Sequence, residues 1–230
     1  QLLTKKRQIK QGAMQELLTG KRRLPGFHKR WSEVRLGEVG RTYGGLTGKS
    51  KADFGHGASK YITFMNVMTN VRTSAKLVES VQVGPSESQN MVQPGDLLFN
   101  GSSETPEEVA LCSWVENCDA GVFLNSFCFG FRPFVANRLS GLFMAYFFRA
   151  RPGRNAVSSL AQGATRYNIA KTALLQAPIN LPSFDEQKAI AEVLSSMDEE
   201  ITLLQSRLTK ARALKQAMAQ ALLTGRIRLI

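Results

Sequence analysis

The two ends of the chain carry nearly the same sequence. Residues 3–24 read LTKKRQIKQGAMQELLTGKRRL and residues 208–229 read LTKARALKQAMAQALLTGRIRL, with 13 of 22 positions identical at an offset of 205. A common helical composition does not explain the shared LLTG-x-x-R-L ending. We therefore expect the chain to start at the tail of one repeat unit and to end at the tail of the next.

The segment that leads into the second copy predicts one long helix. Ser183 and Glu186 form a capping box at its start, and Gly225 is a natural stop. A helix of about 40 residues extends about 60 Å, too long for the core of a small domain. We expect its apolar seam to pair with a helix of the other repeat or of a second chain, rather than to pack on its own domain. The seam residues are Ile190, Leu194, Met197, Ile201, Leu204 and Leu208.

Between the helices the sequence changes to patterns typical of strands. One helix is expected after Asn137, where apolar residues recur at helical spacing. The alternating Phe123, Phe127, Phe129 and Phe131 are expected to pack in the core. The predicted strands are VRLGEV (34–39), YITFMNV (61–67), LVESVQV (77–83), DLLFN (96–100), VALCSW (109–114) and VFLNSFCFGF (122–131).

These patterns predict an α+β fold, in which long coiled-coil-forming helices flank a β-rich globular domain. Residues 1–24 are expected to be the end of a first helix. Residues 25–182 are expected to form the globular domain, and residues 183–230 the second helix.

The net charge of +12 indicates a polyanionic partner, with nucleic acid ahead of an anionic membrane surface. No apolar run could span a membrane, and three cysteines without zinc-ligand spacing favour a cytoplasmic protein without a metal. Between Asp119 and Asp185 there are no acidic residues, so we expect a basic surface for a phosphate backbone, against the alternative of chance clustering. The bases there are Arg132, Arg138, Arg149, Arg151, Arg154, Arg166 and Lys171.

Three polar loops and one further lysine are the predicted DNA contacts. Gln, Asn and Arg make bidentate contacts with bases, whereas Ser, Thr and Lys commonly contact phosphates. We therefore expect Arg166 to reach a base edge, and three lysines to contact phosphates: Lys49, Lys51 and Lys171. For each loop alone, an ordinary turn is the alternative. The full predicted set is Thr47, Lys49, Ser50, Lys51, Asn100, Ser102, Ser103, Gln162, Thr165, Arg166, Tyr167, Asn168 and Lys171.

The sequence predicts no catalytic residues and no metal ligands. Gly44–Ser50 reads GGLTGKS and resembles a P-loop, but the Walker A pattern needs a glycine five positions before Gly48, where Tyr43 stands. His28 and His56 have no triad context. Two other function classes stay open here: an NTP-binding enzyme that uses Gly44–Ser50, and a coiled-coil adaptor that does not bind DNA.

Several further motifs stand along the chain. They are Trp31-x5-Gly37-Glu38, Pro94-Gly95-Asp96-Leu97-Leu98, Gly163-Ala164-Thr165-Arg166, Ile179-x-Leu181-Pro182-x3-Glu186-Gln187, the Ile190…Leu194…Asp198…Ile201 helix and the LLTG endings. Together they resemble the specificity subunits of type I restriction–modification systems, and the likeness covers essentially the whole chain. The ends are its most specific part, whereas the body is expected to vary with the target sequence.

The resemblance implies two target-recognition domains per subunit, each followed by a conserved helix, with the two helices paired antiparallel. Residues 25–182 are then one target-recognition domain, which reads one half of a bipartite double-stranded DNA site. Since a first such domain is lacking, the chain is expected to be a fragment or a half-length subunit that forms a homodimer through its long helix.

The resemblance also implies that the chain itself is not catalytic and binds no cofactor. Methylation would reside in a modification subunit that uses S-adenosylmethionine. Translocation and cleavage, with ATP and Mg, would reside in a restriction subunit.

Overall fold

The structure is a computed structural model that describes residues 1–135, 137–163 and 166–224. The chain divides into two compact units: a larger one from Met14 to Ala191, and a smaller one of residues 1–13 with the chain from Glu192 onward. Helices α1 (Leu2–Leu17) and α7 (Phe184–Leu223) each contribute to both units. Each unit is described separately below.

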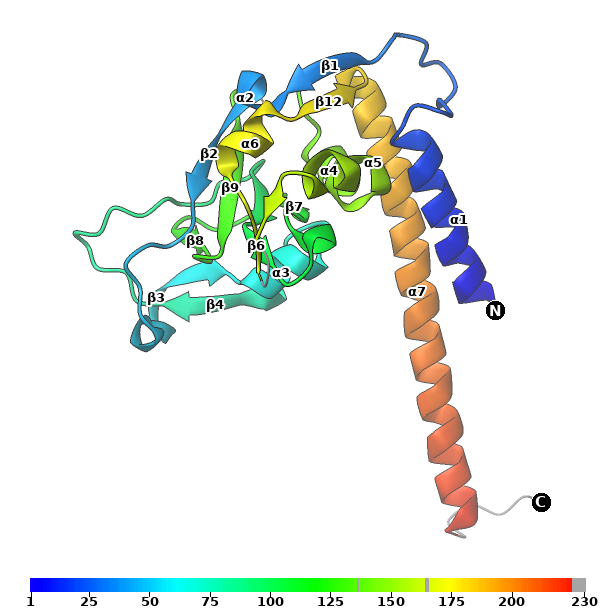
Figure 1. Ribbon diagram of the computed structural model, residues 1–230. Coiled ribbons are helices and arrows are strands. Elements are labelled where there is room, and N and C mark those ends of the chain that lie inside the picture. Colours follow the sequence, from blue (N-terminus) through cyan, green and yellow to red (C-terminus); the bar gives the residue numbers. More distant parts are fainter. Residues whose placement is uncertain (136, 164–165, 225–230) are drawn as a thin grey trace. The chain divides into compact units, whose positions relative to one another are not determined.

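In the described part of the larger unit, short strands form four small sheets (Figure 1). The largest has the antiparallel order β2-β9-β5-β7, and a second has the order β4-β3-β8 with β3 parallel to β8. The others are β10-β11-β6 and β1-β12. The strands are β1 (Ser32–Arg35), β2 (Gly40–Gly44), β3 (Phe54–Ile62), β4 (Val78–Val81), β5 (Leu97–Asn100), β6 (Ser102–Ser103), β7 (Cys112–Trp114), β8 (Val122–Leu124), β9 (Cys128–Pro133), β10 (Ala161–Gln162), β11 (Tyr167–Ile169) and β12 (Pro178–Leu181).

One part of the core of the larger unit lies between the largest sheet and helix α4 (Gly141–Arg149), and another part includes Ile62, Leu98 and Leu124. All four residues of β5 are buried. The Phe99 ring stacks on Phe129 at 5.4 Å between centroids and meets Phe148 of α4 edge-on at 5.2 Å. The Ser140 hydroxyl accepts from the backbone N–H of Phe143 and caps α4. The helix predicted after Asn137 is therefore confirmed, and so is the mixed α+β class.

Several predicted strands are wrong in part. The predicted strand 122–131 is two strands, β8 and β9, separated by a turn, and short helices replace part of two others. Residues 64–67 belong to a helix whose start is fixed by Thr63, since the Thr63 hydroxyl accepts from the N–H of Asn66. The predicted strand 34–39 ends at Arg35 and continues as a helical turn. The helices and 3₁₀ turns of the larger unit, besides α4, are α2 (Leu36–Val39), α3 (Phe64–Thr69), α5 (Arg151–Ser158), α6 (Lys171–Gln176), η1 (Lys51–Asp53), η2 (Ala75–Leu77) and η3 (Pro106–Glu108).

The start of α7 is tied to the larger unit by two buried polar residues. The Glu186 carboxylate accepts from Arg23 Nε at 2.5 Å and Nη2 at 2.6 Å, so Glu186 pairs with an arginine where the sequence predicted a capping box. The Gln187 amide bonds to the backbone of Ser140, Arg138 and Pro182. Glu186 and Gln187 therefore stabilise the fold at the start of α7.

In the smaller unit, α1 and α7 pair antiparallel. Lys6 Nζ lies 2.7 Å from the Glu200 carboxylate, and Lys10 Nζ lies 2.5 Å from that of Asp198. Because the partner number falls as the α1 number rises, the two helices run in opposite directions. None of the helices in the described part of the chain has the length and apolar character to span a bilayer.

The predicted seam of α7 changes along the helix. Ile190 and Leu194 are buried, and Met197, Ile201 and Leu204 are half-buried. Leu208 is 37% exposed, and beyond it Leu214, Met218, Leu222 and Leu223 are exposed as well. The seam is thus covered over its first half and open over its second. The predicted stop at Gly225 lies outside the described residues.

Candidate nucleic-acid interface

Segments from all three predicted polar loops line one cleft of about 290 Å³ in the larger unit. The loop after β2 forms one wall, the start of β6 and the turn between β8 and β9 form another, and β11 with the first residue of α6 closes the third. The lining residues are Gly44, Gly45, Leu46, Thr47, Gly101, Ser102, Ser126, Phe127, Cys128, Phe129, Asn168, Ile169 and Lys171.

Glycines allow the walls of the cleft to approach closely. A Cβ on Gly45 would lie 2.1 Å from the carbonyl oxygen of Asn125, so a side chain at this position would push the loop and the turn apart. The Gly101 N–H donates to the carbonyl of Phe127 at 2.8 Å. The Asn125 side chain accepts from the N–H of Phe127 at 2.9 Å and holds the turn between β8 and β9.

Arg166 is held against this turn. Its Nε donates to the Ser102 hydroxyl at 3.3 Å, and its guanidinium carbon lies 5.1 Å from the Phe127 ring centroid. Phe127 is 56% exposed, so its predicted place in the core is wrong. The reason is that Phe127 lies in a turn between two strands, where the strand alternation does not hold. Arg166 itself is exposed.

The other residues of this region lie on β10, β11 and α6. Gln162 pairs with Asn168 in the strand register, and both are exposed, whereas Tyr167 is half-buried. Lys171 is exposed, and its Nζ lies 3.4 Å from the position that a Cβ on Gly44 would take. Thr165 lies outside the described residues.

The loop Thr47–Lys51 makes bonds of its own. Lys49 Nζ lies 2.6 Å from the Glu87 carboxylate, and Gln89 accepts from the N–H of Thr47 at 3.1 Å. The hydrogen bond from Lys49, with those from Gly84 and Gln89, lowers the pKa of Glu87 to about 2. The Ser50 hydroxyl donates to Asp53 at 2.8 Å, whereas Lys51 is exposed.

Asn100 cannot contact DNA, so its prediction is wrong. The side chain is fully buried. Its amide nitrogen donates to the carbonyls of Ser102 at 3.1 Å and Glu108 at 2.8 Å, and its oxygen accepts from the N–H of Leu111 at 2.7 Å. Asn100 therefore shapes the loop that carries Ser102. Ser103 is also buried, and its hydroxyl donates to Glu108.

The predicted basic surface of residues 132–171 is smaller than the sequence indicated, because three of its arginines serve the fold. Arg132 donates to Asp96 through Nε and Nη2, both at 2.8 Å. Arg149 donates to four backbone carbonyls, and Arg154 donates to those of Val109, Ala110 and Phe148. Burial lowers the pKa of Arg149, and lowers that of Arg154 to about 10. The exposed bases are Arg138, Arg151, Arg166 and Lys171.

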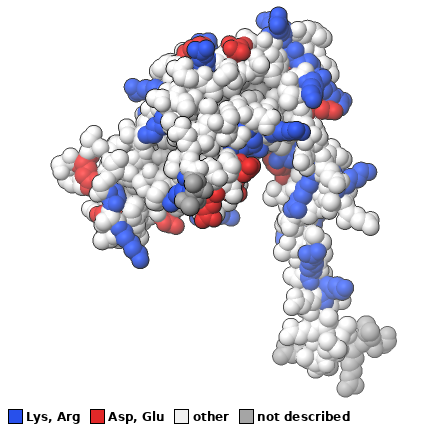
Figure 2. All heavy atoms as spheres, viewed as in Figure 1, with Lys and Arg blue, Asp and Glu red and all other residues white. Residues whose placement is uncertain are grey.

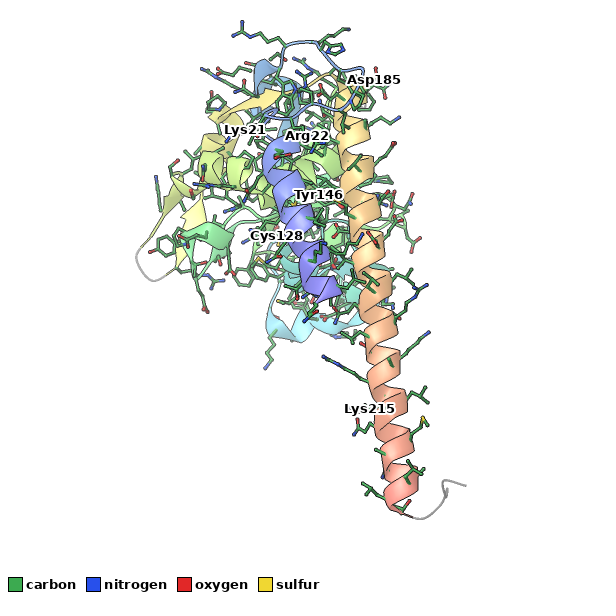
Figure 3. The ribbon with its side chains drawn as sticks, turned by 90° about the vertical axis from the view of Figure 1, so that its right-hand side faces the viewer. Lys21, Arg22, Cys128, Tyr146, Asp185 and Lys215 are labelled. Atoms are coloured by element: carbon green, nitrogen blue, oxygen red, sulfur yellow. The ribbon has the colours of Figure 1, made fainter. Side chains whose placement is uncertain are left out.

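The geometry around Gly44–Ser50 does not resemble a P-loop. The segment leads into a single 3₁₀ turn, η1, and then into β3, so it does not open directly into an α-helix as a P-loop does. Burial raises the pKa of the Cys112 and Cys128 thiols, which disfavours their thiolates (Cys128 is labelled in Figure 3). In the described ranges, no three His, Cys, Asp or Glu side chains gather as a metal site.

Comparisons with known proteins agree on one family. The model of the type I restriction modification DNA specificity domain matches residues 28–212. The chain is 25% identical over 203 residues to the type I restriction enzyme StySPI specificity subunit of Salmonella potsdam, covering 86% of this chain and 42% of that protein. The chain thus spans less than half of this relative's length.

Solved structures share the fold. An HsdS subunit from Thermoanaerobacter tengcongensis superposes with a TM-score of 0.62 at 18% identity, over 96% of this chain and 51% of that one. A type I restriction–modification S subunit from M. genitalium superposes with a TM-score of 0.54 at 16% identity, over 86% of this chain and 46% of that one.

Proposed function

The specificity-domain match covers most of the chain, so this protein belongs to the type I restriction–modification DNA specificity family, and we propose that it reads one half of a bipartite duplex DNA site. The observation that carries the proposal is the meeting of three polar segments around one cleft, with Arg166 and Lys171 beside it. Loops held on a rigid scaffold are a common way to build such a recognition site.

Arg166 is the proposed base reader. Its Nε is already bonded to Ser102, and the Phe127 ring lies on the guanidinium face, so the terminal nitrogens are the groups left to meet a base. Such a fork matches the O6 and N7 acceptors of guanine. Gln162 and Asn168 are exposed amides in the same small sheet and are proposed as further base or phosphate contacts, as is Tyr167.

Lys51 and Lys171 are the proposed phosphate contacts, because both are exposed and basic. Lys49 is a weaker candidate, since it must exchange the Glu87 carboxylate for a phosphate. Ser102 is buried and is proposed to orient Arg166 through its hydroxyl. Thr47 and Ser50 are exposed and stay proposed phosphate contacts, although their hydroxyls bond to Gln89 and Asp53. Ser103 is buried and its hydroxyl bonds to Glu108, so it is proposed to shape the loop.

The remaining roles are proposed from family membership. Residues 25–182 would form the target-recognition domain, and residues 1–24 and 183–230 would form the paired helices that set its spacing. The chain would be non-catalytic and would direct a modification subunit that uses S-adenosylmethionine and a restriction subunit that uses ATP and Mg, in the cytoplasm. A second copy is a further proposed partner, because the exposed half of the α7 seam offers a face for it.

Methylome mapping with the cognate modification subunit tests the proposal and yields the cognate site. The complex should methylate one bipartite sequence. Arg166→Ala should then cost about 1–3 kcal/mol on that site and far less on random DNA. Arg138→Ala, also an exposed arginine of the larger unit, is the matched control. Equal losses on both DNAs would reassign Arg166 to a phosphate, and a complex without sequence preference would favour the adaptor function.

A further inference from the structure

Two consecutive segments of α7 carry opposite charges, and we call them its acceptor half and its donor half. Its acceptor half, residues 192–206, has acidic residues at Glu192, Asp198, Glu199 and Glu200 and no base. Its donor half, residues 207–222, has Arg207, Lys210, Arg212 and Lys215 and no acidic residue. Figure 2 shows Lys and Arg along the lower part of this helix, and Figure 3 labels Lys215 there. Two such helices placed antiparallel bring unlike charges together.

The acceptor half already has an occupant, α1. Besides the ion pairs of Lys6 with Glu200 and Lys10 with Asp198, the Arg7 guanidinium donates to Gln205 at 2.9 Å. On the face of α1 that carries these contacts, Leu3, Lys6, Lys10 and Ala13 are half-buried, whereas Arg7 is exposed.

The sequence of the donor half repeats that of α1. The repeat aligns α1 with residues 207–222, so Arg212 corresponds to Arg7, Lys215 to Lys10 and Leu208 to Leu3. Where the face differs, the donor half is the more apolar: Ala211 replaces Lys6 and Met218 replaces Ala13. The corresponding residues of the donor half, Leu208, Ala211, Lys215 and Met218, are all exposed.

We propose that α1 and the donor half of a second copy compete for the acceptor half, so that α1 limits homodimerisation of this chain. In the dimer, Arg212 and Lys215 of each copy take the places that Arg7 and Lys10 hold in the monomer, opposite Gln205 and Asp198 of the partner. This pairing is isologous and places Leu208 close to the two-fold axis. It rests on the homodimer part of the proposed function and is independent of DNA recognition.

Opposing free-energy contributions determine whether α1 or a second copy occupies the acceptor half. α1 is tethered to the same chain, which gives it a high effective concentration, and its two ion pairs and the hydrogen bond from Arg7 lie between residues 198 and 205 of α7. The second copy costs association entropy. In return it covers both the acceptor and donor halves of each helix and buries the apolar stripe of the donor half.

Charge reversal separates the two occupants. Lys6→Glu with Lys10→Glu weakens α1 but leaves the donor half intact, so the dimer dissociation constant from sedimentation velocity should fall about tenfold. Arg212→Glu with Lys215→Glu should abolish the dimer. Lys5→Glu with Lys21→Glu changes net charge equally at exposed residues and should leave the constant unchanged.

A thiol crosslink tests the same competition without reversing charges. In a Cys118→Ser background, where the remaining native thiols are buried, Arg7→Cys with Gln205→Cys joined by a short bismaleimide should fix α1 in place. The crosslinked chain should then stay monomeric, whereas the unreacted chain should dimerise. Asp198→Cys with Lys215→Cys lie about 25 Å apart on one helix, so their short crosslink should form only between copies.

Each experimental outcome tests a different part of the proposal. An unchanged dissociation constant after Lys6 and Lys10 reversal, with dimers still formed, would overturn the competition and keep the dimer. No dimer for any variant would overturn both, while cognate DNA recognition could still be measured. If reversal of Arg212 and Lys215 weakens DNA binding but not the dimer, the donor half serves DNA and the proposal fails.

Discussion

Arg149 is the most informative residue for separating the fold from the DNA interface, because it is one of the seven bases expected to form a basic surface for a phosphate backbone. In the structure its Nη1 and Nη2 donate to the carbonyls of Val67, Met68 and Asn70 at the end of α3, and its Nε donates to Cys112 of β7 at 2.6 Å. It therefore joins α4, α3 and β7. Arg149→Met should destabilise the protein and leave the salt dependence of DNA binding unchanged.

The magnitude follows from these four bonds. Hydrogen bonds to a charged group contribute about 1.5–3 kcal/mol each, but Arg149 is partly buried and water replaces part of what is lost, so about 1 kcal/mol per bond is the better figure. Since methionine fills much of the same volume, we expect the unfolding free energy to fall by about 3–5 kcal/mol. This is a large part of the 5–15 kcal/mol typical of a domain.

Urea unfolding measures the effect through the transition midpoint, which should fall by about 1–2 M with an unchanged slope. Arg151→Met is the matched control: Arg151 is exposed, and we expect a change within about 0.5 kcal/mol. Arg149→Lys keeps the charge with fewer donors and should be intermediate. If Arg149→Met destabilises no more than Arg151→Met, or flattens the salt slope as a phosphate contact would, the structural assignment is wrong.

Three further predictions concern charged side chains that the fold either pairs or leaves exposed. Lys51→Ala and Lys171→Ala should each flatten the slope of log K against log salt on random duplex DNA by about 0.9, and Lys49→Ala by less, because Glu87 already binds it; equal flattening by all three would contradict this. Asp96→Asn should lower the unfolding free energy by about 3–5 kcal/mol relative to the exposed control Asp119→Asn in thermal melts, because the buried carboxylate binds Arg132 and the Tyr43 hydroxyl. The pKa of Glu87 is lowered from 4.5 to about 2, so its contact with Lys49 contributes stability above pH 4.5 that is lost as the pH falls toward 2; hydrogen exchange of residues 47–50 should rise over that range in the native chain but not in Lys49→Ala.

The sequence predicted the elements whose pattern is strong over many residues. The long helix appears as α7, and the helix after Asn137 appears as α4. Short helices were missed because a single turn of apolar or β-branched residues has no helical period to detect. Thr63 before α3, and Pro152 in the first turn of α5, were available as start signals.

For the candidate site, the residue types indicated which side chains are able to contact DNA, but not whether these side chains point to the surface or into the fold. Asn100 and Arg149 have suitable side chains for DNA contact, and both are used by the fold, since carbonyls distant in sequence or in the next loop lie within reach. Phe127 shows the reverse case: its alternating position indicated the core, whereas a turn held by Asn125 exposes it beside Arg166. These assignments depend on backbone geometry that residue spacing does not specify.

Some polar groups of the larger unit are bonded within the fold, whereas others are exposed beside the cleft. This difference explains how one scaffold can read different DNA sites. Asn100 and Arg149 each bond to several backbone groups, and Arg132 pairs with the buried Asp96, so a substitution there costs stability before it alters recognition. Arg166, Lys171 and Gln162 are exposed beside the same cleft, and substitutions of such surface residues usually cost little stability. Specificity can therefore change by replacing the exposed group while the buried group keeps the loops in place. On this argument Arg166→Gln should shift the preferred base from guanine toward adenine without lowering the unfolding free energy, whereas Asn100→Asp should do the opposite.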